Sequence, residues 1–247
     1  MNVIVDKIKI RKQIWTKLKN VALPDSRFNY NFEEYIPDFN GSEKAHSLIY
    51  DQDDYKNSTF IFITPDNCLE GLREQSIKDG KTIIVSTYGI YRGFKKISKI
   101  NVPVGQEKFA STLDGLEIFG EDISLSSINT SFDLLITGAS AVSKNGVRFG
   151  KGHGFFDLEW GMFFDMNYVN EKTNVYAVIH EVQKVDYALE PSETDILVDK
   201  IFTNKAAYLT DRILPRPNGI YWDKLEKGML ESTPPLQELK ELKQIKY

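Results

Sequence analysis

Residues 58–87 read STFIFITPDNCLEGLREQSIKDGKTIIVST and contain two short apolar runs with a helical pattern between them. The run at 58–64 predicts a buried strand, and residues 65–67 predict the turn that follows it. Residues 69–78 predict a helix, and residues 82–87 predict a second strand. A strand, a helix and a strand joined by short turns form a βαβ unit, which indicates a parallel sheet.

The same alternation continues along the chain. Further strands are predicted at 132–137, 174–179 and 195–203, and further helices at 6–20, 43–49, 155–169 and 234–246. There is no internal repeat and no strong boundary. We therefore expect one α/β domain over residues 1–247, in which residues 1–50 form a basic N-terminal helix and arm.

The amino-acid composition excludes several classes of protein. The chain has 247 residues, 41% hydrophobic and 27% charged, as in an ordinary globular protein. Its 31 Lys and Arg against 35 Asp and Glu give a net charge of −4, which argues against nucleic acid as a partner. The single cysteine, Cys68, excludes an intrachain disulfide and a cysteine-cluster metal site. No apolar run reaches the roughly 18–20 residues of a membrane span, and residues 1–7 lack a signal-peptide pattern. We expect a cytoplasmic monomer or small homo-oligomer with no membrane partner.

The N-terminal region is locally basic. The first twenty residues contain a single acid, Asp6, and six cations: Lys7, Lys9, Arg11, Lys12, Lys17 and Lys19. The predicted helix carries a charged face that is either solvated or delivers cations to an anionic ligand. Residues 23–45 read as an ordered connection containing Phe28, Tyr30, Phe32 and Tyr35. These rings either stack on a flat ligand or pack the arm against the core.

The segment 146–161, GVRFGKGHGFFDLEWG, carries the strongest chemical signal. Its glycines expose backbone N–H groups, Arg148 and Lys151 add positive charge, and the predicted helix directs its N-terminus at the loop. Together these features are typical of a phosphate site. The spacing matches neither the Walker A pattern nor the dinucleotide fingerprint. The alternative is a tight turn with solvated cations.

Several other side chains are candidates for chemistry. Asp157, in the first helical turn, is either a ligand for the metal ion that accompanies phosphates or a simple helix-terminal charge. Glu159 could supplement it, although two residues along a helix it points to a different face. His180, Glu181 and Asp186 suggest acid–base work or, alternatively, a satisfied histidine at a strand end, whereas His46 reads as a surface helix residue.

These motifs resemble those of the 5-formyltetrahydrofolate cyclo-ligase (methenyltetrahydrofolate synthetase) family. The segments that carry the resemblance are FDLLI at 132–136, GVRFGKGHGFFD at 146–157, KIKIR at 7–11 and ETDILVD at 193–199. The chain is most similar to the branch of methenyltetrahydrofolate synthetase domain-containing proteins, through PDNCLEGLR at 65–73, DGKT at 79–82, GHGFFDLE at 152–159 and RPNGIYW at 216–222. The resemblance covers nearly the whole chain.

The resemblance implies a three-layer α/β/α sandwich with a Rossmann-like, mostly parallel sheet, of the CoA-transferase-like type. It implies an ATP- and Mg²⁺-dependent reaction on a reduced folate or related pterin, in one-carbon metabolism. Lys7 and Arg11 would reach the ATP phosphates from the arm. The rest of the nucleotide site would be Arg148, Gly150, Lys151, Gly152, His153, Gly154, Phe155 and Phe156, with Arg148 and Lys151 as the catalytic cations. Asp157 and Asp195 would hold Mg²⁺.

The chain departs from the family pattern at two places. Phe155-Phe156 stands where the family has two tyrosines, and no acid aligns cleanly with the one that binds folate, for which Asp66 and Glu70 are candidates. Two functions therefore remain open. One is a 5-formyltetrahydrofolate cyclo-ligase, and the other is a diverged nucleotide-binding protein with a different substrate or no activity. A nucleic-acid-binding regulator, suggested by the basic arm, is opposed by the net charge.

Overall fold

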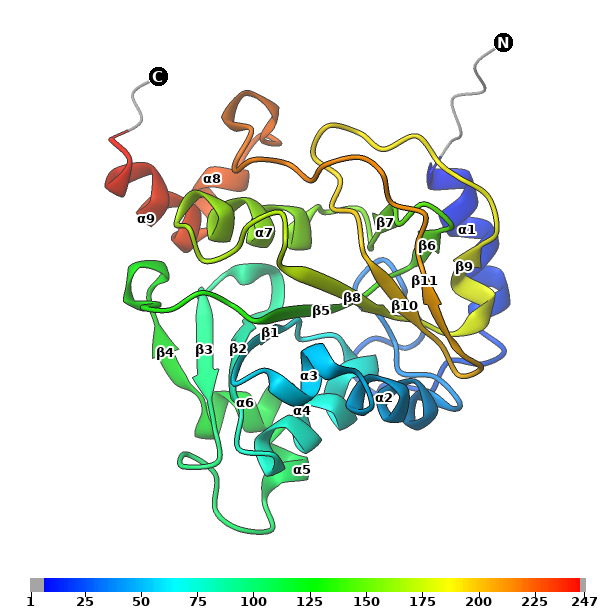
Figure 1. Ribbon diagram of the computed structural model, residues 1–247, viewed down its shortest axis with the longest axis horizontal. Helices are drawn as coiled ribbons and strands as arrows, with labels where there is room; N and C mark the ends of the chain where they lie inside the picture. The colour runs from blue at the N-terminus through cyan, green and yellow to red at the C-terminus, as the bar shows by residue number, and fades with distance from the viewer. Residues whose placement is uncertain (1–6, 245–247) are drawn as a thin grey trace.

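The computed structural model describes residues 7–244 (Figure 1). The helices are α1 Lys7–Leu18, α2 Ser42–Tyr50, α3 Asp53–Asn57, α4 Glu70–Lys78, α5 Glu107–Ala110, α6 Leu113–Phe119, α7 Phe155–Asp165, α8 Met229–Ser232 and α9 Pro234–Leu242. The strands are β1 Phe60–Ile63, β2 Thr82–Ser86, β3 Phe94–Ile97, β4 Glu121–Ile123, β5 Leu134–Gly138, β6 Ala141–Ser143, β7 Arg148–Phe149, β8 Asn174–Val178, β9 Lys184–Val185, β10 Lys200–Phe202 and β11 Ala207–Leu209.

The main sheet has eight strands in the order β11-β10-β8-β5-β1-β2-β3-β4. Its five central strands, β10, β8, β5, β1 and β2, pair in parallel, and β3, β4 and β11 add antiparallel edges. A second, small sheet has the order β7-β6-β9 and lies beside α1 (Figure 1). The predicted α/β fold with a mostly parallel sheet is confirmed.

Alternating side chains of the central strands fill two separate cores. Ile61 and Ile63 of β1 pack in the core that contains side chains of α2 and α4. Phe62, between them, packs with Trp160 and Phe163 of α7 in the other core. Because strand residues alternate between faces, an all-apolar run such as FIFI is suited to a sheet that is covered on both sides. Figure 1 shows the resulting layers, with α2–α6 below the sheet and α7–α9 above it.

The described elements differ from the predicted ones in three places. The strand expected at 195–203 is wrong in its first half, because only β10 joins the sheet while Val198 N donates instead to Gly146 O at 2.9 Å. The helix expected at 155–169 ends at Asp165, and Asn167 nearby is left-handed with φ 60°. The region from β3 to β4 had no predicted structure, because two adjacent lysines interrupt the apolar pattern of β3 and the edge strand β4 is short and acidic.

The N-terminal arm folds back onto the small sheet. Helix α1 buries Ile10 and Ile14 against Val147 and Phe149, and the predicted helix 6–20 is thus largely confirmed, with Asp6 outside the described residues. The connection that follows is ordered by an aromatic cluster, in which Phe32 is 3% exposed. The cations of the arm are therefore carried on a packed element.

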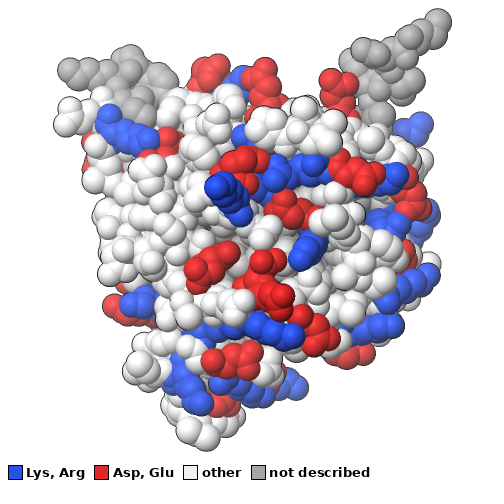
Figure 2. Space-filling view, viewed as in Figure 1, with Lys and Arg blue, Asp and Glu red and all other residues white. Residues whose placement is uncertain are grey.

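Positive and negative side chains are interspersed on the face of the molecule shown in Figure 2. That face offers no single-sign surface, as the near-balanced composition leads one to expect. In the part of the chain that the structure describes, no helix combines the length and the apolar character needed to cross a bilayer.

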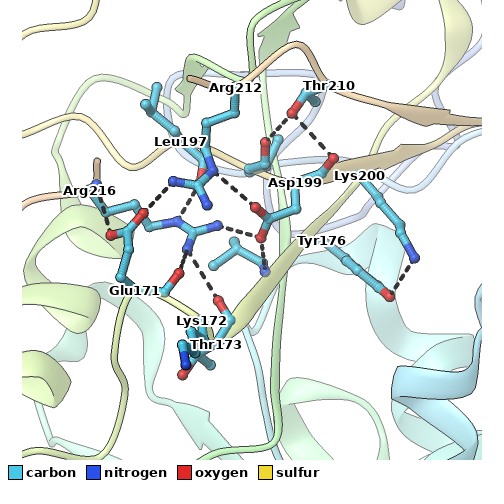
Figure 3. A network of polar contacts seen from close by, with 12 residues as sticks. Glu171, Lys172, Thr173, Tyr176, Leu197, Asp199, Lys200, Thr210, Arg212 and Arg216 are labelled. Atoms are coloured by element: carbon cyan, nitrogen blue, oxygen red, sulfur yellow. Dashed lines mark hydrogen bonds and ion pairs between the residues drawn. The ribbon is translucent and has the colours of Figure 1, made fainter. Parts of the chain in front are cut away.

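A buried ion network fixes the segment between β8 and β10 (Figure 3). The Arg216 side chain is fully buried, forms an ion pair with Asp199, and donates from Nε to Leu197 O at 2.7 Å and from Nη1 to Thr173 O at 3.1 Å. Arg212 Nε donates to the other Asp199 oxygen at 3.0 Å. This network accounts for the late start of β10, because Asp199 belongs to the network and the strand begins only at the next residue.

We predict that Arg216→Met destabilises the fold by about 3–5 kcal/mol, the cost of removing one partner from a buried ion pair. Arg92→Met is the matched control, because Arg92 pairs with Glu117 at the surface and its side chain is 64% exposed. That control is expected to cost less than about 1 kcal/mol. Urea unfolding of both variants measures the difference, and equal small losses would contradict the structural role of Arg216.

Candidate functional site

A cavity of about 280 Å³ opens at the carboxyl ends of β1 and β2. Residues that follow these strands, Thr64–Asn67 and Ser86–Ile90, form one side of it. The loop 148–154 and the first turn of α7 form the other side. Loops at the carboxyl ends of parallel strands converge in this way in doubly wound sheets, where ligands bind. The segment singled out for phosphate binding thus lines this cavity.

The glycine loop is shaped by backbone conformations that favour glycine. Gly152 has φ +123° and Gly154 has φ +65°, where Gly154 caps the N-terminus of the eleven-residue helix α7. A Cβ on Gly150 would lie 3.2 Å from Arg148 Nη2. The loop therefore brings backbone, guanidinium and helix N-terminus together, which is the arrangement that binds anions.

Arg148 is a buried and rigidly held cation. Its Nε and Nη2 donate to Gly138 O at 3.0 and 2.9 Å, and its guanidinium lies 4.8 Å from the ring centre of Phe156. The side chain is near both Asp157 and Glu159, and its charge lowers the pKa of each of these carboxyls. Arg148 is thus a fixed positive charge at the centre of the cavity wall.

The arm reaches the glycine loop, as expected from the sequence. Arg11 Nε donates to Gly150 O at 2.8 Å, and the Arg11 guanidinium lies 5.7 Å from the ring centre of Phe149. Burial and the nearby charge of Arg148 lower the pKa of Arg11. Lys7 forms an ion pair with Asp195. Both cations line the cavity.

The two carboxylates expected to hold a metal lie at one end of the cavity. Asp157 Oδ1 accepts from the backbone N of Ile196 at 3.0 Å, so the loop before β10 does fold back to the helix start. Burial raises the pKa of Asp157 to about 6, Arg148 opposes this shift and Asp195 adds to it. Within residues 7–244 there is no group of three or more His, Cys, Asp or Glu suited to a metal. Two carboxylates beside a loop suited to anions nevertheless provide the oxygen ligands that Mg²⁺ prefers, and this ion commonly takes its remaining ligands from phosphate and water.

Lys151 stands beside an aromatic wall. Its Nζ donates to Glu34 O at 2.7 Å and lies 4.8 Å from the ring centre of Tyr88, and burial lowers its pKa. Phe28 stacks between Tyr35, at 4.7 Å, and Tyr88, at 5.8 Å, and all three rings line the cavity. The two interpretations of the aromatic arm, stacking on a flat ligand and packing of the arm, thus fit different residues. Phe28 and Tyr35 line the cavity, whereas Phe32 is buried in the core of the arm.

Glu159 emerges as a cavity residue that the sequence underrated. It and Asp157 do have different neighbours, but the cavity extends around the end of α7 and both line it. Glu159 is 2% exposed, and its Oε2 is buried without a hydrogen-bond partner. Burial raises its pKa to about 8, against a hydrogen bond from Ser86 that lowers it. The available signal was a second acid, two residues after Asp157, inside the apolar run FFDLEWGMFF.

Of the remaining candidates, one lines the cavity and the others do not. Asp66 lines the cavity, and its Oδ2 accepts from Gly138 N at 3.0 Å, whereas Glu70 is not part of the cavity wall. His180 accepts from Val182 N at 3.1 Å and caps a turn, which is the satisfied state expected for it. His46 was wrongly expected at the surface. It is 5% exposed, because its Nε2 bonds to Cys68 O at 2.7 Å.

The sequence also did not place the segment 217–229 in the site. Pro217, Gly219, Ile220 and Tyr221 line the cavity, beyond the last strand of the main sheet. The segment is tied to α7, since Trp160 Nε1 donates to Pro217 O at 2.9 Å and Ile220 N donates to Asp165 Oδ2 at 2.8 Å. A wall made by long-range contacts leaves no local pattern in the sequence.

Comparison with known proteins relates the sequence of this chain to a family. The model of the 5-formyltetrahydrofolate cyclo-ligase family matches residues 3–204. A human methenyltetrahydrofolate synthase domain-containing protein is 35% identical over 241 residues, which are 96% of this chain and 62% of the human protein. A Danio rerio protein of the same name is 32% identical over 242 residues and 62% of its length. The chain therefore spans less than two thirds of these relatives.

A solved structure supports the fold. The NMR structure of Aquifex aeolicus 5,10-methenyltetrahydrofolate synthetase superposes with a TM-score of 0.52 and 19% identity, covering 88% of this chain and 98% of that one. At this identity the likeness concerns the arrangement of the layers and strands alone.

We predict that Glu159→Gln changes how stability depends on pH. The folded-state pKa of about 8 lies above the ordinary value of 4.5, so the folded protein holds this proton more tightly than the unfolded chain does. The resulting stability is complete below about pH 4.5 and is lost as the pH rises to about 8. Relative to the parent, Glu159→Gln should therefore gain stability across this window, by up to about 4 kcal/mol. Urea unfolding at pH 5 and pH 8.5 tests this, and a difference that is the same at both pH values would refute it.

Proposed function

Because this chain belongs to the 5-formyltetrahydrofolate cyclo-ligase family, we propose that it converts 5-formyltetrahydrofolate to 5,10-methenyltetrahydrofolate with ATP and Mg²⁺. The observation that carries the proposal is the meeting, in one cavity, of the glycine loop, four cations from two distant segments, and the pair Asp157 and Asp195. Within the proposal, residues 1–247 act as one cytoplasmic domain to which residues 1–50 contribute the basic arm.

The proposed reaction is a phosphoryl transfer followed by ring closure. The formyl oxygen attacks the γ-phosphorus of ATP and ADP leaves. The neighbouring folate nitrogen then attacks the formyl carbon, loses its proton, and phosphate departs to leave the methenyl bridge. Such a transfer needs positioning and charge neutralisation more than a covalent residue, which suits a cavity lined with cations and backbone amides.

The cations have donors to spare for phosphate oxygens. Lys151 uses one of its three N–H donors on Glu34 O, and Arg148 uses Nε and Nη2 on Gly138 O. The N–H groups that remain can bind phosphate while these existing bonds keep the side chains in place. Holding them in advance lowers the reorganisation needed at the moment of transfer.

Asp157 and Asp195 would hold Mg²⁺, which when bound neutralises phosphate charge and aligns the γ-phosphoryl group. Lys7 now pairs with Asp195 and would share that carboxylate with the ion. The fit rests on the donor set, because two carboxylates beside a glycine loop provide the oxygen ligands that Mg²⁺ takes.

A second function keeps the nucleotide half and changes the other. Phe155 and Phe156 carry no hydroxyls, and the Phe156 ring lies against the Arg148 guanidinium. A diverged nucleotide-binding protein with another substrate, or without catalytic activity, would retain the loop and the cations but would form no methenyl product.

One experiment distinguishes these functions. The protein is incubated with ATP, Mg²⁺ and 5-formyltetrahydrofolate, while methenyl absorbance and ADP release are followed together. Equal formation of both products supports the cyclo-ligase. ATP binding with no methenyl product supports the diverged protein instead.

We predict that Lys151→Ala weakens ATP binding by roughly 1.5–3 kcal/mol, the range for hydrogen bonds to charged groups. Lys144→Ala is the matched control, since Lys144 lies outside the main cavity and its side chain is 61% exposed. Calorimetry on both variants gives the comparison, and unchanged ATP affinity in the Lys151 variant would rule out its phosphate role.

We predict that Asp157→Asn removes most ATP turnover and leaves the fold intact. Burial already disfavours the ionised form of Asp157, so the neutral amide is tolerated there. Asp195→Asn should lose less activity, because Asp195 shares its charge with Lys7. Asp186→Asn, whose side chain is 81% exposed, serves as the control. Parental turnover in Asp157→Asn would reject the metal role.

A further inference from the structure

The cavity has a second end whose chemistry is opposite to that of the phosphate end. This acidic end is defined by Asp66 and Glu159, which line the cavity together with Ser86 and lie within electrostatic reach of one another. Lys7, Arg11 and Asp195 lie at the phosphate end, with the glycine loop. A ligand that fills the cavity must therefore present phosphate to one end and a different chemical edge to the other.

The acidic end has more acceptors than donors. Glu159 Oε2 is buried with no partner, while Ser86 bonds the same carboxyl group. Two cations, Arg148 and Lys151, act on Glu159, and Nε and Nη2 of Arg148 are already directed at Gly138 O. Burial favours the protonated form of this carboxyl, and its unpartnered oxygen is costly in either form. A ligand that donates N–H groups satisfies that oxygen and favours the ionised form, so it gains by filling this corner.

The cavity also has a flat apolar side, which begins at Tyr88, two residues after the Ser86 that bonds Glu159. Phe28, Tyr35 and Tyr88 form a stacked row that lines the cavity. Aromatic faces beside a carboxyl suit a planar heterocycle, since its face contacts the rings while its edge reaches the acid.

We propose that Glu159 is a specificity-determining residue that accepts hydrogen bonds from the amino group and adjacent ring N–H of a 2-amino-4-oxopyrimidine edge, such as the one that a reduced pterin carries. This inference rests on the proposed function, because 5-formyltetrahydrofolate presents that edge. It assigns the edge to α7 rather than to the turn at 66–70, where the acid expected by resemblance would lie. Glu70 is not part of the cavity wall, whereas Glu159 is.

The test is a comparison of two ligands on three variants. The ligands are 5-formyltetrahydrofolate and its analogue in which methyl replaces the 2-amino group. The wild type should bind the first at least about tenfold more tightly, as buried groups that bind a substrate N–H reject analogues lacking it. Glu159→Leu should reduce this preference to less than about twofold, and Glu159→Gln, which keeps the size and one acceptor oxygen, should fall between them.

Controls separate the possible failures. Glu70→Gln should keep the wild-type preference, and ATP affinity should stay within about twofold in every variant because the phosphate end is unchanged. Wild-type preference in both Glu159 variants would overturn the inference and leave the proposed function standing. Loss of preference in Glu70→Gln alone would assign the edge to the turn and equally overturn it. If the wild type binds ATP but neither folate compound, the proposed function fails and the inference fails with it.

Discussion

The bond between the Arg148 guanidinium and the Gly138 carbonyl is the constraint around which the site is organised. It joins the carboxyl end of central strand β5 to the start of the glycine loop. A buried cation needs compensation, and Arg148 has it in that carbonyl, in the ring face of Phe156, and in the two carboxyls of α7. Each of these groups lines the cavity or anchors a residue that does. The positions of loop, helix and strand end are thus set by the charge of a single side chain.

The N-terminal arm is best understood as part of this charge balance. Its apolar stripe, Ile10 and Ile14, covers the small sheet that bears Arg148, and two of its cations, Lys7 and Arg11, then face the cavity. Burial lowers the pKa of Arg11, and repulsion from Arg148 lowers it further. Two like charges are held together only because packing and carbonyl bonds hold both. An anion between them would relieve this repulsion, as the proposed function requires.

The sequence predicted what depends on local pattern and missed what depends on distant contacts. Apolar runs and turn residues located the parallel strands, and glycine spacing located the loop. Asp195 could be assigned only through the family resemblance, because its segment is positioned by Arg216 some twenty residues later along the chain. The burial of His46 was missed because it goes with a contact to a residue far along the chain, the bond between its Nε2 and Cys68 O. Glu159 was underrated because helix periodicity describes directions around a helix axis, whereas this cavity extends around the helix end.

The substitution of phenylalanine at 155–156 has a consistent physical meaning in this setting. Phe156 is 2% exposed and lies flat against the Arg148 guanidinium, so it excludes water from the cation instead of donating a hydrogen bond. Removing water lowers the local dielectric and strengthens the interaction of Arg148 with any phosphate in the cavity. The hydroxyls that the family pattern supplies are thereby replaced by a drier environment for a fixed charge. Since electrostatic stabilisation in such a site grows as water is excluded, loss of the tyrosines does not by itself remove the means of stabilising a transferring phosphoryl group.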